Sequence, residues 1–303
     1  MNETSAAAPA VRAHHYDTRT LRLHTLEAGD PQAPLVICLH GFPDTADTWR
    51  TLLPALATAG YYAVAPHMRG YAPSAQAPDG DYRVPVLADD ALALADALKR
   101  SRFAIVGHDW GSVAAHYLAN AAPERVSAMV TAAVPHPRSL RPHPQQLWNS
   151  RYMLAFQWRG RAERRVRADN FAAIDELWRR WSPGWQYTPE DIAPIKTALA
   201  APGGVQAALA YYRALPQAIG RALHDPKARA QLRTTFARTR VPTLAMAGID
   251  DGCMRAAGFR DGESHYSGPF RLQLLADAGH FMHREQPDAF AESTLAWFAL
   301  HAH

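Results

Sequence analysis

The sequence predicts an α/β fold, in which a mostly parallel sheet is flanked by helices and interrupted by a helical insertion. Short continuous apolar runs, such as residues 33–40 and 61–66, are typical of strands covered on both faces. Amphipathic helical segments separate these runs, and alternating strands and helices favour parallel pairing. Residues 136–236 contain no convincing buried strand, which predicts the insertion.

The expected elements follow this rhythm along the chain. The predicted strands cover residues 21–29, 33–40, 61–66, 103–108, 126–135, 242–250 and 270–280. The helices expected between and after them cover residues 46–60, 89–100, 111–123 and 287–300. The strand at 21–29 alternates apolar and polar side chains, which indicates an outer strand.

The insertion divides the chain into two predicted parts. Residues 1–135 and 237–303 form the core, and residues 136–236 form a helical cap. We expect the cap over the carboxyl ends of the strands, where open α/β sheets bind ligands. Residues 1–15 are expected to be flexible.

Composition limits the classes of partner. The 303 residues carry a net charge of +4, with basic residues concentrated at 159–167. Glu163 interrupts that segment, and no aromatic stacking pattern accompanies it, so we interpret it as a solvated helix face. We therefore expect neither nucleic acid nor a membrane as a partner, and the sequence leaves open a monomer or a homodimer.

The cysteines and the amino terminus favour a cytoplasmic protein. The two cysteines, Cys38 and Cys253, do not indicate a disulfide framework. The first residues have neither the basic nor the apolar region of a signal peptide, and no apolar run is long enough to cross a bilayer.

A glycine-flanked aspartate follows the strand at 103–108. Gly107, Asp109 and Gly111 have the spacing of a nucleophile elbow, in which glycines allow a helix to approach a sharp strand-to-helix turn. Asp109 occupies the position where many hydrolases have serine. An alkylated serine would be an inert ether, whereas an alkylated aspartate is an ester that water can cleave.

An acid and a histidine are expected downstream of this nucleophile. Asp250 and Asp251 follow the strand at 242–250, and we favour Asp251 from its position relative to Gly248. His280 follows the last strand, and of the fifteen histidines it alone ends a strand with an acid placed before it.

The loop after the strand at 33–40 is expected to supply hydrogen-bond donors. The backbone N–H groups of Phe42 and Trp110 would point at the carboxylate oxygen of Asp109, where charge develops during reaction. We interpret two other histidines, His108 and His283, as structural or incidental.

These motifs together resemble a known family. "HGFPDT" at residues 40–45, "RGY" at 69–71, "GHDWGS" at 107–112 and "GHF" at 279–281 are similar to the epoxide hydrolase and haloalkane dehalogenase group of the α/β-hydrolases. The likeness extends from about residue 17 to 300. It implies an alkyl-aspartate intermediate, a histidine that activates water, and no cofactor or metal. It also marks His40, Gly41 and Pro43 as supporting motif residues.

The leaving group separates the two activities of this group. In haloalkane dehalogenases the position of Phe42 is commonly asparagine, whose amide holds the halide beside a tryptophan such as Trp110. Epoxide hydrolases instead use two cap tyrosines as acids. "RYMLAFQ" resembles the first tyrosine motif and selects Tyr152, and "AYYRAL" resembles the second and selects Tyr212, with adjacent Tyr211 as the alternative.

The resemblance therefore implies a hydrolase acting on ether bonds, which converts a small apolar epoxide and water to a vicinal diol. Asp109, His280 and Asp251 would form the triad, with Tyr152 and Tyr212 as acids. Haloalkane dehalogenase is the alternative enzyme. A small-molecule-binding relative without activity is the alternative of another class.

Overall fold

The computed structural model describes residues 9–302. Its strands form a single sheet of the order β1-β2-β4-β3-β5-β6-β7-β8, in which β1, β2 and β4 pair antiparallel and the remaining neighbours pair parallel. The strands are β1 (Arg12–Asp17), β2 (Arg22–Ala28), β3 (Leu35–Leu39), β4 (Tyr62–Pro66), β5 (Phe103–His108), β6 (Val126–Ala132), β7 (Thr243–Gly248) and β8 (Phe270–Leu275). This confirms the predicted mostly parallel sheet.

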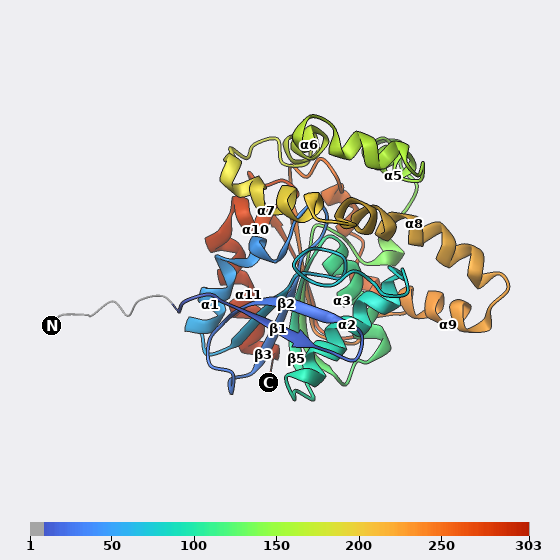
Figure 1. Cartoon of the computed structure of the whole chain (residues 1–303). Coiled ribbons are helices and arrows are strands. Elements are labelled where there is room, and N and C mark those ends of the chain that lie inside the picture. Colours follow the sequence, from blue (N-terminus) through green and yellow to red (C-terminus); the bar gives the residue numbers. More distant parts are fainter. Residues whose placement is uncertain (1–8, 303) are drawn as a thin grey trace.

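Helices cover both faces of the sheet (Figure 1). Four of them pack on it: α1 (Leu52–Thr58), α2 (Val84–Ala97), α3 (Trp110–Ala121) and α11 (Pro287–His301). Residues of β3 alternate between two core clusters: Leu35 and Ile37 pack in one cluster with residues of α2 and α3, and Val36 packs in the other with residues of α1 and α11. Every residue of β3 is therefore buried, which explains its continuous apolar sequence.

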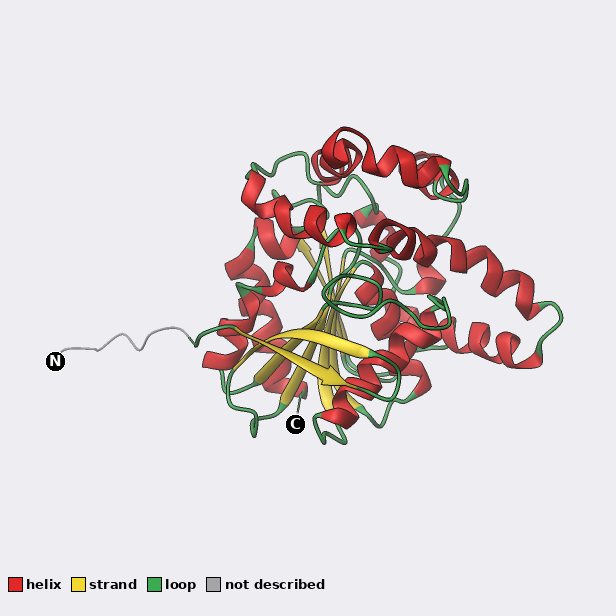
Figure 2. Cartoon of the chain, viewed as in Figure 1, coloured by secondary structure: helices red, strands yellow, loops and turns green. Residues whose placement is uncertain are grey.

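The segment between β6 and β7 is helical (Figure 2). Its helices are α4 (Pro144–Asn149), α5 (Arg151–Ala155), α6 (Arg161–Trp181), α7 (Pro189–Ala200), α8 (Gly204–Ala222) and α9 (Pro226–Thr235). In Figure 1, α5 to α8 lie together at one end of the sheet. Residues 136–236, all of which the structure describes, contain no strand, whereas the limits of the cap as a separate domain stay a prediction.

Short helices complete the described chain. They are η1 (Ala46–Trp49), η2 (Pro137–Ser139), η3 (Ala256–Phe259), η4 (Glu263–His265) and α10 (Met282–Glu285). Across residues 9–302, no helix combines the length and the apolar character that a bilayer-spanning segment requires.

The amino-terminal prediction needs a correction. Residues 1–8 lie outside the described residues, but residues 12–15 belong to β1 and are not a flexible tail. Strand β1 pairs antiparallel with β2 from Arg12 to Asp17, so β2 is also not the outer strand. The side chains of β1 are mostly exposed, and the strand is held by its backbone pairing with β2. Its sequence therefore has no apolar pattern that would predict a strand.

The elbow glycines allow close backbone contacts. A Cβ atom on Gly111 would lie 2.1 Å from the carbonyl oxygen of Leu39, and one on Gly107 would lie 2.5 Å from Gly111.

We expect Gly111→Ala to lower the free energy of unfolding by about 3 kcal/mol, because the new methyl group would collide with the backbone of Leu39 in a central strand. Gly220→Ala is the matched control, since a Cβ there meets nothing within 4 Å. Urea unfolding of both variants measures the difference, and equal stabilities would contradict the packing argument.

Candidate active site

Asp109 lies at the junction of β5 and α3. Its φ of 50° and ψ of −114° are a conformation that side-chain-bearing residues rarely adopt. Ser112 anchors the turn, because its hydroxyl donates to the carbonyl oxygens of Gly107 and Ala132 and accepts from the Ala132 N–H. The predicted elbow is therefore present, with a carboxylate at its tip.

Two backbone N–H groups donate to this carboxylate. The Phe42 N–H donates to Oδ1 of Asp109 at 2.8 Å, and the Trp110 N–H is the second donor. Gly41 permits the approach, because a Cβ atom there would lie 2.3 Å from Cβ of Asp109. The pair is the arrangement expected from the sequence for Phe42 and Trp110.

The motif residues beside Phe42 hold this loop in place. His40 bonds with Nδ1 to the Gly41 carbonyl and with Nε2 to the Met68 N–H, both at 2.9 Å. Burial lowers the pKa of His40 to about 4, so it is neutral at pH 7 and accepts at Nε2. The Phe42–Pro43 peptide is cis, and the Pro43 carbonyl accepts from the indole N–H of Trp178 in α6.

Burial raises the pKa of Asp109. The His280 imidazole and the two N–H donors act in the opposite direction, because they stabilise the charged carboxylate. The side chain is thus a desolvated carboxylate whose charge depends on a few specific partners.

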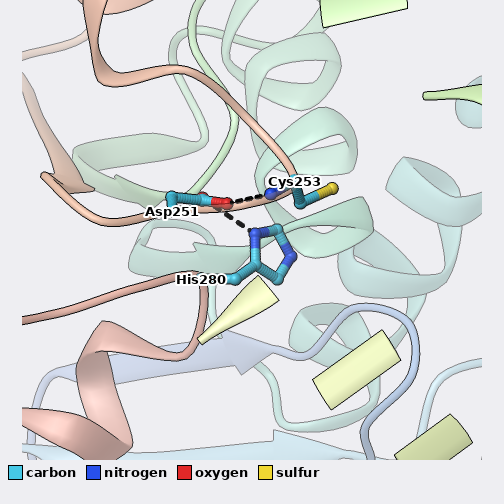
Figure 3. Close-up of side chains that lie close together, drawn as sticks. All are labelled: Asp251, Cys253 and His280. Atoms are coloured by element: carbon cyan, nitrogen blue, oxygen red, sulfur yellow. Dashed lines mark hydrogen bonds and ion pairs between the residues drawn. The ribbon is translucent and has the colours of Figure 1, made fainter. Parts of the chain in front are cut away.

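His280 pairs with Asp251 and not with Asp250. Nδ1 of His280 lies 2.9 Å from Oδ2 of Asp251, and both side chains are buried. Figure 3 draws this interaction as a dashed line. Asp250 is exposed. Oδ1 of Asp251 accepts from the N–H groups of Cys253 and Met254, so this carboxylate is held at both oxygens.

The other nitrogen of His280 faces the nucleophile position. Nε2 lies 3.7 Å from Oδ2 of Asp109 and has no hydrogen-bond partner within residues 9–302. Burial alone would lower the pKa of His280, but the charge and hydrogen bond of Asp251, together with the charge of Asp109, raise it.

Contacts that the sequence did not reveal hold the His280 backbone. Its N–H donates to the Trp181 carbonyl at 3.0 Å, and its carbonyl accepts from Nε2 of His108 at 2.9 Å. Burial lowers the pKa of His108 well below 6.5, so its single N–H is this donor. His108 is therefore structural, as predicted, but its role is specific.

The cap also secures the loop around His280. Ser182 donates to Glu285 and accepts from the N–H of Phe281, and Glu285 accepts from the N–H of Gly279. The other predicted structural histidine, His283, bonds through Nε2 to the Thr48 hydroxyl. No motif in the sequence marks Trp181, Ser182 or Glu285 for these contacts.

The two adjacent tyrosines of α8 have different environments. The Tyr211 hydroxyl donates to the Arg69 carbonyl at 2.9 Å. The Tyr212 hydroxyl is buried near the Trp110 indole without completing a hydrogen bond to any described residue. Burial, and next the charge of Asp109, raise the pKa of Tyr212 well above 10, so the hydroxyl keeps its proton.

Tyr152 of α5 approaches the same region. Its ring lies 5.6 Å from that of Tyr212 and 5.1 Å from that of Trp181, measured between centroids. Its hydroxyl and Sγ of Cys253 form a 3.7 Å hydrogen bond. Burial, and next Cys253, raise the pKa of Tyr152 well above 10.

Comparison with known proteins identifies the family of the chain. Residues 34–287 match the α/β hydrolase fold family. The chain belongs to this family. It is 32% identical to Epoxide hydrolase A of Mycobacterium tuberculosis over 302 aligned residues, covering 89% of this chain and 92% of that protein. It is 28% identical to the AB hydrolase superfamily protein YfhM of Bacillus subtilis, covering 91% and 94%.

Solved structures show the same α/β-hydrolase fold. The crystal structure of Epoxide Hydrolase A from Mycobacterium thermoresistibile superposes with a TM-score of 0.80, covering 96% of this chain and 99% of the other. Its sequence identity is 24%. The chain is thus an epoxide hydrolase-like member of the α/β-hydrolase family, which confirms the resemblance and the fold inferred from its motifs.

Three side chains of the types that can bind a metal ion lie close together in this site. Asp251, Cys253 and His280 offer ligand atoms within 4.8 Å of one another (Figure 3). Nδ1 of His280 is already hydrogen-bonded to Asp251, whose second oxygen accepts two backbone N–H groups. These hydrogen bonds account for the positions of the acid and the histidine.

A cavity of about 370 Å³ adjoins the site between α5 and α6. Tyr152 lines it, whereas Asp109, His280 and Tyr212 do not. Most of its wall is apolar, with side chains such as Phe156, Ile174 and Leu177. All of its lining residues lie between Arg151 and Arg180, so α5, α6 and the loop between them form this cavity.

Proposed function

We propose that this α/β-hydrolase converts an epoxide and water to a vicinal diol through an alkyl ester of Asp109. One observation carries the proposal: two protonated cap tyrosines, Tyr152 and Tyr212, approach a buried carboxylate that has a histidine beside it. The 32% identity to an epoxide hydrolase over most of both chains supports the same activity.

In the first step Asp109 attacks a carbon of the epoxide ring. Oδ1 is occupied by the Phe42 N–H, so Oδ2 is the attacking oxygen. The carbon–oxygen bond of the ring breaks as the ester bond forms, and the ring oxygen takes a proton from Tyr152 or Tyr212. A phenol suits this role because it is protonated at pH 7, and an unassisted alkoxide is a poor leaving group.

In the second step water cleaves the ester. Nε2 of His280 accepts a proton from the water, and Asp251 stabilises the imidazolium and fixes the tautomer. The hydroxide adds to the carboxyl carbon of Asp109. The N–H groups of Phe42 and Trp110 stabilise the resulting oxyanion. Its collapse breaks the ester bond, and the departing alkoxide takes the proton of the new carboxyl group, which gives the diol and the Asp109 carboxylate. The imidazolium of His280 then loses its proton to solvent and the tyrosinate regains one, which restores the starting state.

The pH dependence of turnover follows from the His280–Asp251 pair. Only neutral His280 accepts a proton, so turnover is expected to fall as the pH decreases through its raised pKa. Asp251→Asn removes the largest attraction that raises this pKa. The fall of kcat on the acid side of the pH profile is therefore expected at lower pH in this variant than in the wild-type protein. Profiles of kcat against pH for both proteins measure the shift. An acid limb at the same pH in Asp251→Asn would contradict the assignment of the pair.

Parallel assays on one aryl epoxide and one bromoalkane test the proposed function. We expect diol formation from the epoxide, loss of it in Asp109→Asn, and bromide release that is slow by comparison. Faster bromide release than diol formation would assign the chain to the dehalogenases instead. Binding of epoxides without turnover of either compound would favour a non-catalytic relative.

A further inference from the structure

The loop that carries Asp251 has no regular secondary structure. Residues 249–255 connect β7 to η3 and belong to neither a helix nor a strand. Two N–H groups of this loop, those of Cys253 and Met254, donate to Oδ1 of Asp251 at 2.6 and 2.9 Å. Figure 3 draws the first of these bonds beside the contact between Asp251 and His280. The direction of the Asp251 carboxylate therefore depends on the position of residues 253 and 254.

Gln146, in α4 of the cap, holds this loop. Its Nε2 donates to the Cys253 carbonyl at 2.9 Å, and its Oε1 accepts from the Arg255 N–H at 3.1 Å. Cys253 is thus bonded to Asp251 through its N–H and to Gln146 through its carbonyl. One amide side chain of the cap therefore contacts the loop on both sides of the residues that fix the acid.

The preceding residue of α4 has a different role. Gln145 is exposed, and its Nε2 donates to Oδ1 of Asn149 in the same helix at 3.0 Å. Gln146 is half-buried and bonds to residues that follow more than 100 positions later in the chain. The two adjacent glutamines are therefore a matched pair, of which Gln146 bonds to the loop and Gln145 to its own helix.

The end of α6 holds the same loop through backbone atoms. The Trp181 carbonyl accepts from the N–H of Gly252 and from that of His280, both at 3.0 Å. A Cβ atom on Gly252 would lie 2.0 Å from the Arg180 carbonyl oxygen, so the loop and the helix end are in direct contact. The acid and the base are therefore both held by the cap, and Gln146 supplies the part of this support that a side-chain substitution can remove.

We propose that Gln146 is a positioning residue for the hydrolytic step, because it keeps the Asp251 carboxylate against His280 while α4 contacts the loop. The inference rests on the proposed function for the reaction itself. It adds that the activation of water depends on the position of a cap helix. The cap would thus act on the base of the second step as well as on the leaving oxygen of the first.

Gln146→Met is expected to slow ester hydrolysis by about 10-fold. Methionine has a similar length but forms neither hydrogen bond, and the loss of two ordinary hydrogen bonds corresponds to about this factor. Ester formation is expected to keep its wild-type rate, because Asp109 and its two N–H donors lie on other elements. The ester then accumulates, so kcat and KM should fall together while kcat/KM stays near the wild-type value. Rapid mixing with a terminal epoxide, followed by quenching and mass spectrometry of the ester, measures both steps.

Gln145→Met is the control on the neighbouring residue. It is expected to keep the wild-type rates of both steps, since the Gln145 amide bonds within α4. Circular dichroism establishes that each variant is folded. Ester hydrolysis at the wild-type rate in Gln146→Met would overturn the inference. A fall in kcat/KM as large as the fall in kcat would also overturn it, because a general disturbance of the cap would then explain the loss.

The ionisation of His280 tests the same contact without an epoxide. Burial lowers the pKa of His280, whereas Asp251, Asp109 and Glu285 raise it. The pKa values of its buried neighbours His108 and His283 are lowered well below 6.5, so both stay neutral during the titration. A looser Asp251 attracts the imidazolium less strongly, so the pKa of His280 is expected to be lower in Gln146→Met than in the wild-type protein or in Gln145→Met. Nuclear magnetic resonance measures it from the imidazole signal that is missing in His280→Gln.

This titration separates the inference from the proposed function. A lower pKa of His280 in Gln146→Met supports the positioning role even if no epoxide is hydrolysed. Diol formation with the same pKa of His280 and the same rate of ester hydrolysis in all three proteins would leave the proposed function intact. It would reject Gln146 as a positioning residue.

Discussion

His280→Gln is expected to stop after the first chemical step and to gain the mass of one epoxide molecule at Asp109. Asp109 can still attack the ring, because its N–H donors and the cap tyrosines are unchanged. The ester persists, because no neutral nitrogen stands at the position of Nε2 to accept a proton from water. Turnover is expected to fall by about 10⁴-fold or more. Mass spectrometry of the intact protein and of its peptides measures the adduct.

The double variant His280→Gln with Asp109→Asn is the control for this trapping experiment. Asparagine keeps the shape of the side chain but lacks the attacking carboxylate, so no mass increase is expected. His283→Gln is a second control, because His283 is buried nearby but bonds to Thr48 rather than to the nucleophile. The mechanism is wrong if the single variant stays unmodified, or if the added mass maps to a peptide without Asp109.

Replacing both cap tyrosines with phenylalanine is expected to lower kcat/KM for an epoxide by about 10⁴-fold. Each phenol supplies a proton or hydrogen bond to the ring oxygen, and a positioned general acid contributes about 10²- to 10⁴-fold. Tyr212→Phe alone is expected to lose about 10²-fold, because Tyr152 remains. Measurement of the first step by rapid mixing isolates this effect from ester hydrolysis.

Tyr211→Phe is the matched control on the same helix. Its hydroxyl donates to the Arg69 carbonyl, so its loss is expected to cost about 1 kcal/mol of stability and to leave epoxide kinetics near the wild-type value. If Tyr211→Phe lost as much activity as Tyr212→Phe, the assignment between the two neighbours would be reversed. Bromoalkane turnover that survives the double replacement would identify a halide chemistry that needs no phenol.

The positions of Asp109 and His280 were predictable because topology constrains them. Both follow strands of a parallel sheet, and the carboxyl ends of such strands meet at one edge. The apolar runs at β3, β4 and β5 are buried on both faces, so their pattern is strong. Strand β1 has no such pattern, since its contribution is a backbone ladder with exposed side chains.

Neighbouring residues were harder to separate from the sequence. Asp250 and Asp251 are adjacent in a loop. A loop lacks the regular periodicity of a helix or strand, so the sequence does not show which of the two side chains faces His280. Tyr211 and Tyr212 are one residue apart on α8 and therefore point about 100° apart, but the pattern does not show which direction faces Asp109.

The 3.7 Å separation between His280 and Asp109 has a consequence for the timing of the proposed cycle. While Asp109 is charged, it helps to raise the pKa of His280 and so favours the imidazolium. Formation of the ester neutralises Asp109 and removes this attraction. The imidazole then loses its proton more readily, at the moment when a neutral base is needed. Alkylation of Asp109 would thus favour the neutral form of His280 that the hydrolysis of the ester requires.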